Sequence, residues 1–182
     1  MSISSKTMKK YKLFITGGSG MLGSALCFEL GKSYEITASY NSFPVSFANA
    51  EFVKIELSDY QESERIISGA KPDFLIHAAA ITNVDLCEEN PILAEKINAE
   101  ATENIAKICR EHRIKMVYIS TDYIFDGKRG NYSEKDIPSP INVYAKTKYE
   151  GELNVSKTLD DFLIIRTSLF GWNIESKKSF VE

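Results

Sequence analysis

The chain has 182 residues, of which 43% are hydrophobic and 26% are charged, and its formal net charge at pH 7 is −3. This is an ordinary globular composition, and the length is enough for one domain with its own core. The slightly negative charge gives no reason to expect nucleic acid or an anionic membrane as a partner, and no apolar run approaches the roughly 20 residues that span a bilayer. We therefore expect a cytoplasmic globular domain.

The N-terminal residues 1–10 are polar, end in Lys9-Lys10 and lack the apolar segment of a signal peptide. We expect them to form a disordered tail ahead of a single domain over residues 11–182. The three cysteines, Cys27, Cys87 and Cys109, have no CxxC spacing and are predicted to be reduced, mostly buried small side chains. The sequence offers no cluster of His, Cys and acidic residues, so we expect no metal held by this chain.

Apolar segments rich in β-formers alternate with helical patterns along the chain. Strands are predicted at Lys12–Ile15, Glu35–Ala38, Phe52–Ile55, Phe74–His77, Met116–Ser120 and Phe162–Arg166, and helices at Met21–Leu30, Asp59–Ser68, Pro91–Glu111 and Tyr144–Val155. Gly31 is expected to cap the first helix at its C-terminus, and Ser58 to cap the second at its N-terminus. Near-continuous apolar strands that alternate with helices indicate a doubly wound α/β fold with a parallel sheet.

The first predicted strand is followed directly by a glycine-rich turn, Thr16-Gly17-Gly18-Ser19-Gly20-Met21-Leu22-Gly23. A strand, such a turn and a helix together bind the pyrophosphate of a dinucleotide. The helix N-terminus offers unpaired N–H groups and partial positive charge, and the glycines allow close approach. The spacing fits Gly18-x-Gly20-x-x-Gly23 or Gly17-x-x-Gly20-x-x-Gly23. The apolar stripe of Leu22, Ala25, Leu26 and Leu30 supports a helix here, although an ordinary strand-to-helix turn is the alternative.

Ligands of doubly wound folds bind beyond the carboxyl ends of the strands, so the segments after the fourth and fifth strands are candidate sites. The small residues of His77-Ala78-Ala79-Ala80-Ile81-Thr82 would let the backbone approach a flat cofactor, and they would equally well pack the sheet against a helix. In Ser120-Thr121-Asp122-Tyr123, a hydroxyl could donate a hydrogen bond to a substrate carbonyl. A turn-forming role is the alternative for it.

The helix predicted after this segment carries Tyr144 and Lys148, with Asn142 as its expected N-cap. Positions i and i+4 share a helix face, so both side chains can point into one cleft. A tyrosine is a poor acid–base group at neutral pH, and a neighbouring ammonium would lower its pKa by favouring the phenolate. A Tyr-x-x-x-Lys spacing occurs about once by chance in a chain of this composition, so its weight comes from its position after the Ser-Thr segment.

The order of these motifs resembles the extended short-chain dehydrogenase/reductase superfamily, and within it the dTDP-4-dehydrorhamnose reductase family with the related methionine adenosyltransferase β subunit. The resemblance extends over about Lys12 to Gly171, and the run Thr121-Asp122-Tyr123-Ile124-Phe125-Asp126-Gly127 is its most specific part. The other motifs that carry it are Ile15–Gly23, His77–Asp85, Ile97–Ala99, Asn142–Lys148 and Arg166–Ser168. It implies a Rossmann domain that binds NAD(P).

The resemblance also implies residue roles. Tyr144 would donate a proton to the keto oxygen of a sugar, Lys148 would lower the pKa of Tyr144 and hold the cofactor ribose, and Thr121 would bond to the reacting oxygen. The implied cofactor residues are Gly17, Gly20, Met21 and Leu22 at the pyrophosphate, Asp59 at the adenine, and Ala78, Ala79 and Ala80 at the ribose, together with Tyr144 and Lys148. The implied substrate residues are Thr82, Val84, Thr121, Asp122 and Tyr123. Asp59 is equally well explained as a first-turn helix acid. Asn98 is equally well explained by a structural and by a catalytic role.

The expected cofactor is NADP, with NAD as the alternative. Sites that prefer NAD place an Asp or Glu about 20 residues after the glycine turn, where it binds the ribose 2′-OH. Here the segment Thr37-Ala38-Ser39-Tyr40-Asn41-Ser42 holds neither an acid nor an arginine. Ser39 or Asn41 could therefore bond to a 2′-phosphate.

The function implied is NAD(P)H-dependent reduction of the 4-keto group of a nucleotide-diphosphate 6-deoxy sugar, as in dTDP-L-rhamnose biosynthesis, by a protein that could form a homodimer. The first alternative is a non-catalytic, NADP-binding regulatory subunit like the methionine adenosyltransferase β subunit. A second is a nucleotide-sugar epimerase of the same superfamily. Dehydration is disfavoured because Asp122-Tyr123 lacks the second acid of the Asp-Glu pair that dehydratases usually carry.

Two departures from the family pattern bear on this function. Leu169 stands where bacterial reductases often have a tryptophan beside the sugar, with Trp172 three residues later. Family members usually continue well beyond this length, and Ser179-Phe180-Val181-Glu182 resembles the start of a helix. We therefore expect a fragment without the C-terminal substrate lobe, for which full turnover is not expected.

Overall fold

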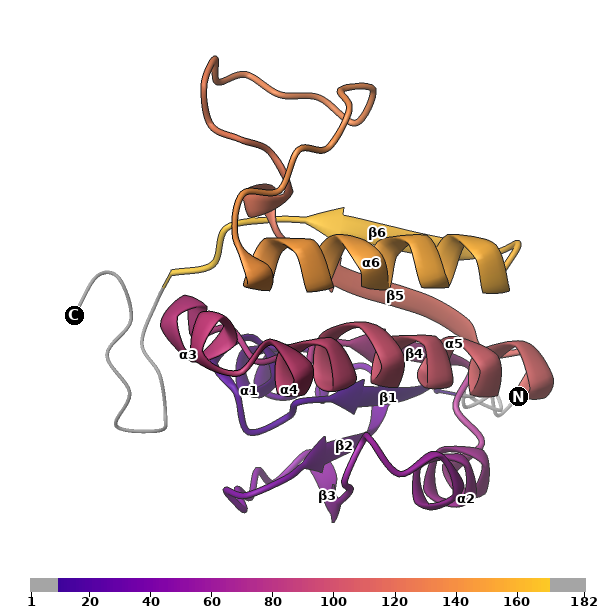
Figure 1. Ribbon diagram of the computed structural model, residues 1–182. Helices are drawn as coiled ribbons and strands as arrows, with labels where there is room; N and C mark the ends of the chain where they lie inside the picture. Colours follow the sequence, from indigo (N-terminus) through magenta and orange to yellow (C-terminus); the bar gives the residue numbers. More distant parts are fainter. Residues whose placement is uncertain (1–9, 171–182) are drawn as a thin grey trace, which may run out of the picture.

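The computed structural model describes residues 10–170, and within them six strands form one parallel sheet. The strands are β1 (Lys12–Thr16), β2 (Glu35–Tyr40), β3 (Ala50–Lys54), β4 (Phe74–His77), β5 (Lys115–Ser120) and β6 (Phe162–Arg166). Their order across the sheet is β3-β2-β1-β4-β5-β6, and every neighbouring pair is parallel (Figure 1). The direction of winding reverses between β1 and β4, where doubly wound folds bind their ligands. The predicted fold class is confirmed.

The helices follow the predicted pattern with two differences. They are α1 (Met21–Leu30), α2 (Tyr60–Ala70), α3 (Val84–Glu89), α4 (Pro91–Glu95), α5 (Ala101–His112) and α6 (Val143–Thr158), with a 3-10 turn, η2, at Asp122–Ile124. The long helix predicted over Pro91–Glu111 is a continuous run of α4, a π-helical segment, η1 (Lys96–Glu100), and α5. The short helix α3 was not predicted. Its N-cap is Asn83, whose side chain accepts a hydrogen bond from Leu86 N.

The core lies mainly between the sheet and α2, α5 and α6, which pack on one face of it. Figure 1 shows α5 and α6 side by side along this face, as right-handed crossovers from β4 to β5 and from β5 to β6 require. On β5 the buried side chains Met116, Tyr118 and Ser120 alternate with less buried ones. The opposite face of β6 is open among the described residues, since Leu163 is 54% and Ile165 38% exposed.

The three cysteines are free and buried, as predicted. Burial raises the pKa of Cys27 to about 11 and that of Cys109 to about 12, which keeps both thiols protonated.

The caps of the helices confirm two predictions and correct one. The Asn142 side chain accepts a hydrogen bond from Ala145 N at 2.7 Å, and Gly31 ends α1 with its N–H on Cys27 O. The N-cap of α2 is Asp59 and not Ser58, because Asp59 Oδ1 accepts from Glu62 N at 3.0 Å. The apolar stripe expected on α1 is confirmed in part. Leu26 and Leu30 pack against the core, whereas Ala25 is exposed. The buried positions are Gly23, Ser24 and Cys27, since small residues allow the helix to approach the sheet closely.

A buried chain of hydrogen bonds connects β1, β4 and α5 through His77 at the end of β4. The Thr102 hydroxyl donates to the carbonyl of Asn98 at 2.7 Å, so it accepts from His77 Nε2 at 3.0 Å. His77 therefore carries its proton on Nε2, and Nδ1 accepts from the Thr16 hydroxyl at 2.7 Å. Burial, with a smaller effect from the charge of Lys148, lowers the pKa of His77 to about 3. His77 is thus neutral and fully bonded.

This arrangement predicts a specific loss of stability in acid. The pKa of His77 rises from about 3 in the native state to 6.5 on unfolding, so the unfolded chain binds the extra proton between these values. The free energy of unfolding should fall by about 1.4 kcal/mol for each pH unit below 6.5 on account of His77 alone. Urea unfolding from pH 7 to pH 4 measures this slope.

The control for this experiment is His77→Gln, which keeps one donor and one acceptor but does not titrate. The variant should be less stable than the wild type at pH 7 and lose less stability on acidification. Equal slopes for the two proteins would contradict the assignment of the buried neutral histidine.

Candidate active site at the switch point of the sheet

The turn between β1 and α1 is shaped by glycines packed against the loop that follows β4. Gly17 has φ +71°, and a Cβ at this position would lie 2.9 Å from the backbone of Ala79. Gly20 caps α1 without a side-chain hydrogen bond, so the first-turn N–H groups, including those of Met21 and Leu22, face the end of the helix. A helix N-terminus of this kind favours an anionic group, and the pyrophosphate contact expected of these residues stays a prediction.

The loop after β4 runs beside this turn, and the protein itself satisfies most of its backbone. The N–H groups of Ala78 and Ala79 donate to the Thr16 hydroxyl at 3.1 and 3.2 Å. Further along, Asn98 accepts from Ile81 N at 2.8 Å and donates to Ile81 O at 3.0 Å. The loop is therefore fixed at both ends. Ala78, Ala79 and Ala80 are half-buried, which leaves part of each at the surface beside Gly17.

The side chain of Asn98 also bonds to α6, since Nδ2 donates to Thr147 Oγ1 at 3.2 Å. Thr147 in turn donates to the carbonyl of Tyr144 at 3.0 Å. The sequence left open whether Asn98 is structural. Its contacts connect the loop after β4 to the first turn of α6, which is a structural role in the described chain.

The ends of β2 and β3 hold an acidic side chain that the sequence reasoning missed. Ser39 is 2% exposed, and its carbonyl accepts from Gly18 N. Asn41 Nδ2 donates to Glu56 Oε2 at 3.3 Å. The acid that binds the ribose 2′-OH was expected at the end of β2, whereas Glu56 follows β3. The pairing of Tyr40 with Lys54 could have placed Glu56 there. Asp59, which is the N-cap of α2, lies at the same edge of the sheet.

The two candidate groups on α6, Tyr144 and Lys148, lie next to β5. The Lys148 side chain is 3% exposed, and its Nζ donates to Ile119 O at 2.8 Å and lies 4.2 Å from the centroid of the Tyr118 ring. Burial lowers the pKa of Lys148 to about 7, and the carboxylate of Glu152 acts against this shift. Lys148 can therefore exist in both protonation states near neutral pH.

The expected lowering of the pKa of Tyr144 is not what the structure gives. Burial is the largest effect and raises the pKa of Tyr144, with smaller increases from Cys87, Asp122 and Tyr123, while a hydrogen bond with the Thr121 side chain lowers it. The reason is that the ammonium of Lys148 is directed at the carbonyl of Ile119, and burial removes the water that would stabilise a phenolate. The expectation was therefore wrong in direction for this structure.

Thr121 directly follows β5 and is 4% exposed. Its hydroxyl accepts from Tyr123 N at 3.2 Å and so caps η2, which supports the turn-forming alternative. The same hydroxyl lies beside Tyr144, and the rings of Tyr123 and Tyr144 meet edge to face with their centroids 6.1 Å apart. A hydroxyl, a phenol and an amine thus gather at the carboxyl end of β5.

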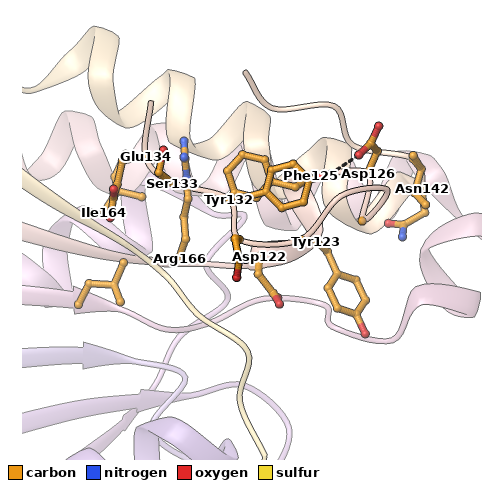
Figure 2. Close-up of a pocket in the computed structure, with 15 residues that line it drawn as sticks. Asp122, Tyr123, Phe125, Asp126, Tyr132, Ser133, Glu134, Asn142, Ile164 and Arg166 are labelled. Atoms are coloured by element: carbon orange, nitrogen blue, oxygen red, sulfur yellow. Dashed lines mark hydrogen bonds between the residues drawn. The ribbon is translucent and has the colours of Figure 1, made fainter. Parts of the chain in front are cut away.

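A cavity of about 1050 Å³ opens beside this group, between η2, the loop before α6 and the end of β6 (Figure 2). Two of the predicted substrate residues, Asp122 and Tyr123, line it. The other three predicted substrate residues do not: Thr82 is exposed, Val84 begins α3, and Thr121 is buried. The other residues that line the cavity are Phe125, Asp126, Gly127, Gly130, Asn131, Tyr132, Ser133, Glu134, Ile141, Asn142, Ile164, Ile165 and Arg166.

The aromatic part of this wall was not predicted, because the loop over residues 125–142 has no regular hydrophobic period. The rings of Phe125 and Tyr132 stack with centroids 4.5 Å apart, and the Tyr132 hydroxyl donates to Asp126 Oδ1, the contact dashed in Figure 2. The wall can therefore offer flat apolar surface and acceptor oxygens to a ligand.

Within residues 10–170, no group of three or more His, Cys, Asp or Glu side chains could hold a metal ion. In the same part of the chain, none of the helices has the length and apolar character needed to cross a membrane.

The chain resembles known proteins in both sequence and structure. It is 34% identical over 157 residues to the probable low-salt glycan biosynthesis reductase Agl14 of Haloferax volcanii, and the matched region covers 85% of this chain and 52% of the relative. It is 32% identical over 171 residues to methionine adenosyltransferase 2 subunit beta of Xenopus laevis, covering 93% of this chain and 50% of the relative. The chain thus spans about half the length of these relatives.

Two solved structures of the same kind resemble the fold closely. A hypothetical dTDP-4-dehydrorhamnose reductase from Sulfolobus tokodaii has a TM-score of 0.79 and 42% identity over 85% of this chain and 55% of that one. The dTDP-4-dehydrorhamnose reductase of Bacillus anthracis, solved in complex with NADP, has a TM-score of 0.76 and 33% identity over 87% and 53%. Residues 11–182 match the family described as the RmlD substrate binding domain. Since this match covers nearly the whole sequence, the chain belongs to that family.

Proposed function

We propose that the chain is the cofactor-binding part of a reductase that uses NADPH, with NADH as the alternative, to reduce the 4-keto group of a nucleotide-diphosphate 6-deoxy sugar. The observation that supports this most is the meeting of Thr121, Tyr144 and Lys148 at the carboxyl end of β5. Family membership and similarity to structures named dTDP-4-dehydrorhamnose reductase support the reaction class. A nucleotide sugar is the substrate proposed for the cavity beside η2.

The glycine turn fits a dinucleotide cofactor. Because Gly17 has no side chain, the turn can pack against the backbone of Ala79, and the uncapped N-terminus of α1 beside it favours an anionic pyrophosphate. When bound, the nicotinamide cofactor supplies the hydride. Gly17, Gly20, Met21 and Leu22 would hold its pyrophosphate, with Asp59 near the adenine.

The residues of the chain would orient the keto oxygen and supply its proton. Thr121 would bond to that oxygen, and Tyr144 would transfer its phenolic proton to it. The raised pKa of Tyr144 suits a group that is protonated before the reaction. Lys148, whose pKa is about 7, would stabilise the phenolate left on Tyr144 when its amine is protonated.

A regulatory subunit that binds NADP without turning it over is the second candidate. The specific observation in its favour is the 32% identity to a methionine adenosyltransferase 2 subunit beta. The set of Thr121, Tyr144 and Lys148 favours the reductase, because a binding subunit has no need of a proton donor.

The direct test of the reductase follows NADPH absorbance after addition of dTDP-4-keto-6-deoxy-L-lyxo-hexose to the full-length protein that contains this chain. We expect consumption of NADPH by the wild type and a loss of about 100- to 10,000-fold in kcat for Tyr144→Phe, which removes the proton donor. Tyr149→Phe, a tyrosine of the same helix outside the proposed set, is the matched control and should keep its rate. NADPH that binds but is never consumed, across several 4-keto sugars, would favour the regulatory subunit.

A second test concerns the choice between the two cofactors. The carboxylate of Glu56 lies at the edge where a 2′-phosphate is expected, so Glu56→Gln should strengthen NADPH binding by about fivefold and change NADH binding little, as expected for removing one charge repulsion of about 1 kcal/mol. Fluorescence titration with each cofactor measures both dissociation constants. Glu51→Gln, an exposed carboxylate on β3, serves as control. Equal effects on NADPH and NADH would show that Glu56 does not face the 2′ position.

A further inference from the structure

A buried carboxylate, Glu152, joins three elements next to the candidate site. Its Oε1 accepts from the Ser120 hydroxyl at 2.5 Å and from Arg166 Nε at 3.0 Å, and its Oε2 accepts from Arg166 Nη2 at 2.7 Å. Glu152 is 3% exposed, and the Arg166 side chain is 24% exposed. The cluster of Ser120, Glu152 and Arg166 therefore binds α6 to the last residues of β5 and of β6.

Each member of this cluster is adjacent to a residue of the candidate site. Ser120 directly precedes Thr121, and Glu152 lies one helical turn after Lys148 and two turns after Tyr144, on the same face of α6. The Lys148 amine donates to Ile119 O, one residue before Ser120. The helix is thus bonded to the end of β5 at two successive points along one face.

Arg166 extends the same cluster to the wall of the cavity. Its guanidinium lies 5.5 Å from the centroid of the Phe125 ring, and both residues line the cavity in Figure 2. Phe125 stacks in turn on Tyr132. Through Arg166, the Glu152 carboxylate therefore connects this part of the cavity wall to the face of α6 that carries Tyr144.

We propose that Glu152 is a positioning residue, whose carboxylate, held by Ser120 and Arg166, fixes α6 so that Tyr144 and Lys148 stand in register with Thr121. The role in catalysis rests on the proposed function. The effect on Lys148 does not, because it is a property of the folded chain alone. Such a role differs from simple stabilisation in that it acts on the charge and placement of Lys148.

The surroundings of Lys148 show why its charge depends on Glu152. Among the described residues, the neutral His77 on β4 and the Tyr118 ring on β5 face Lys148, and neither supplies a negative charge near neutral pH. Glu152 favours the ammonium, and burial opposes it. Removal of the carboxylate would also leave the positive charge of Arg166 uncompensated nearby, which acts on the pKa of Lys148 in the same downward direction.

The test is an NMR titration of the chain labelled at the lysine ε-carbons, with the Lys148 signal assigned by its loss in Lys148→Arg. In Glu152→Gln we expect the pKa of Lys148 to fall by about one unit, since an opposite charge nearby typically shifts a pKa by 1–3 units. Glu150→Gln, an exposed carboxylate of the same helix, should leave it unchanged. An unchanged pKa of Lys148 in folded Glu152→Gln would overturn the proposal.

Two additional readouts keep the proposal falsifiable. Glu152→Asp keeps the charge with a shorter reach, so it should lower the pKa of Lys148 by a smaller amount. This variant decides the question by the same criterion if Glu152→Gln does not fold.

In the full-length protein, Ser120→Ala should reduce kcat by about tenfold and leave KM for NADPH unchanged, as expected when catalytic groups are misplaced. A drop in thermal stability with an unaltered kcat would instead assign Ser120 and its bond to Glu152 to stability alone. Absence of any NADPH consumption by the wild type would count against the proposed function and leave the titration valid.

Discussion

The close approach of the glycine turn after β1 to the alanine loop after β4 is the constraint on which the candidate site depends. A side chain at Gly17 would collide with the backbone of Ala79, so the two loops can meet only because position 17 is a glycine. The Thr16 hydroxyl fixes this contact by accepting from both Ala78 and Ala79, and His77 fixes the hydroxyl. The glycine turn and the alanine loop are therefore held together at the switch point of the sheet, next to the N-terminus of α1.

The catalytic candidates depend on a different balance, between burial and charge. Burial raises the pKa of Tyr144 and lowers that of Lys148, so both groups are pushed towards their neutral forms. Glu152 offsets part of this effect at Lys148. The carboxylate of Glu152 is itself paired with the guanidinium of Arg166 and accepts a hydrogen bond from the Ser120 hydroxyl. Tyr144 and Lys148, one turn apart on the same face of α6, thus combine a protonated phenol with an amine that titrates near neutral pH.

Much of the fold followed from the sequence, because the strands are short apolar runs and the helices have clear caps such as Asn142 and Gly31. What failed was local or depended on tertiary contacts. Ser58 and Asp59 are both good N-caps, but the Ser58 hydroxyl donates to Glu56 Oε1, whereas Asp59 Oδ1 accepts from Glu62 N. Glu56 was missed because it follows β3, whereas its partner Asn41 follows β2. The direction of the pKa shift at Tyr144 required knowledge of burial and of the contact between Lys148 and Ile119. The roles of the candidate residues and the disordered tail over residues 1–10 stay predictions. Trp172 and the helix expected to start at Ser179–Glu182 lie outside the described residues.

The proposed function requires that a dinucleotide bind at the switch point between β1 and β4. Titration of the isotope-labelled chain with NADPH, followed through the backbone amide signals, measures such binding. We expect saturable shifts concentrated at Gly17, Gly20, Met21 and Leu22 and at Ala78 to Ala80, with little change at the far ends of the strands. Saturable shifts that leave these two loops unchanged, or no saturable shift at millimolar NADPH, would contradict this expectation.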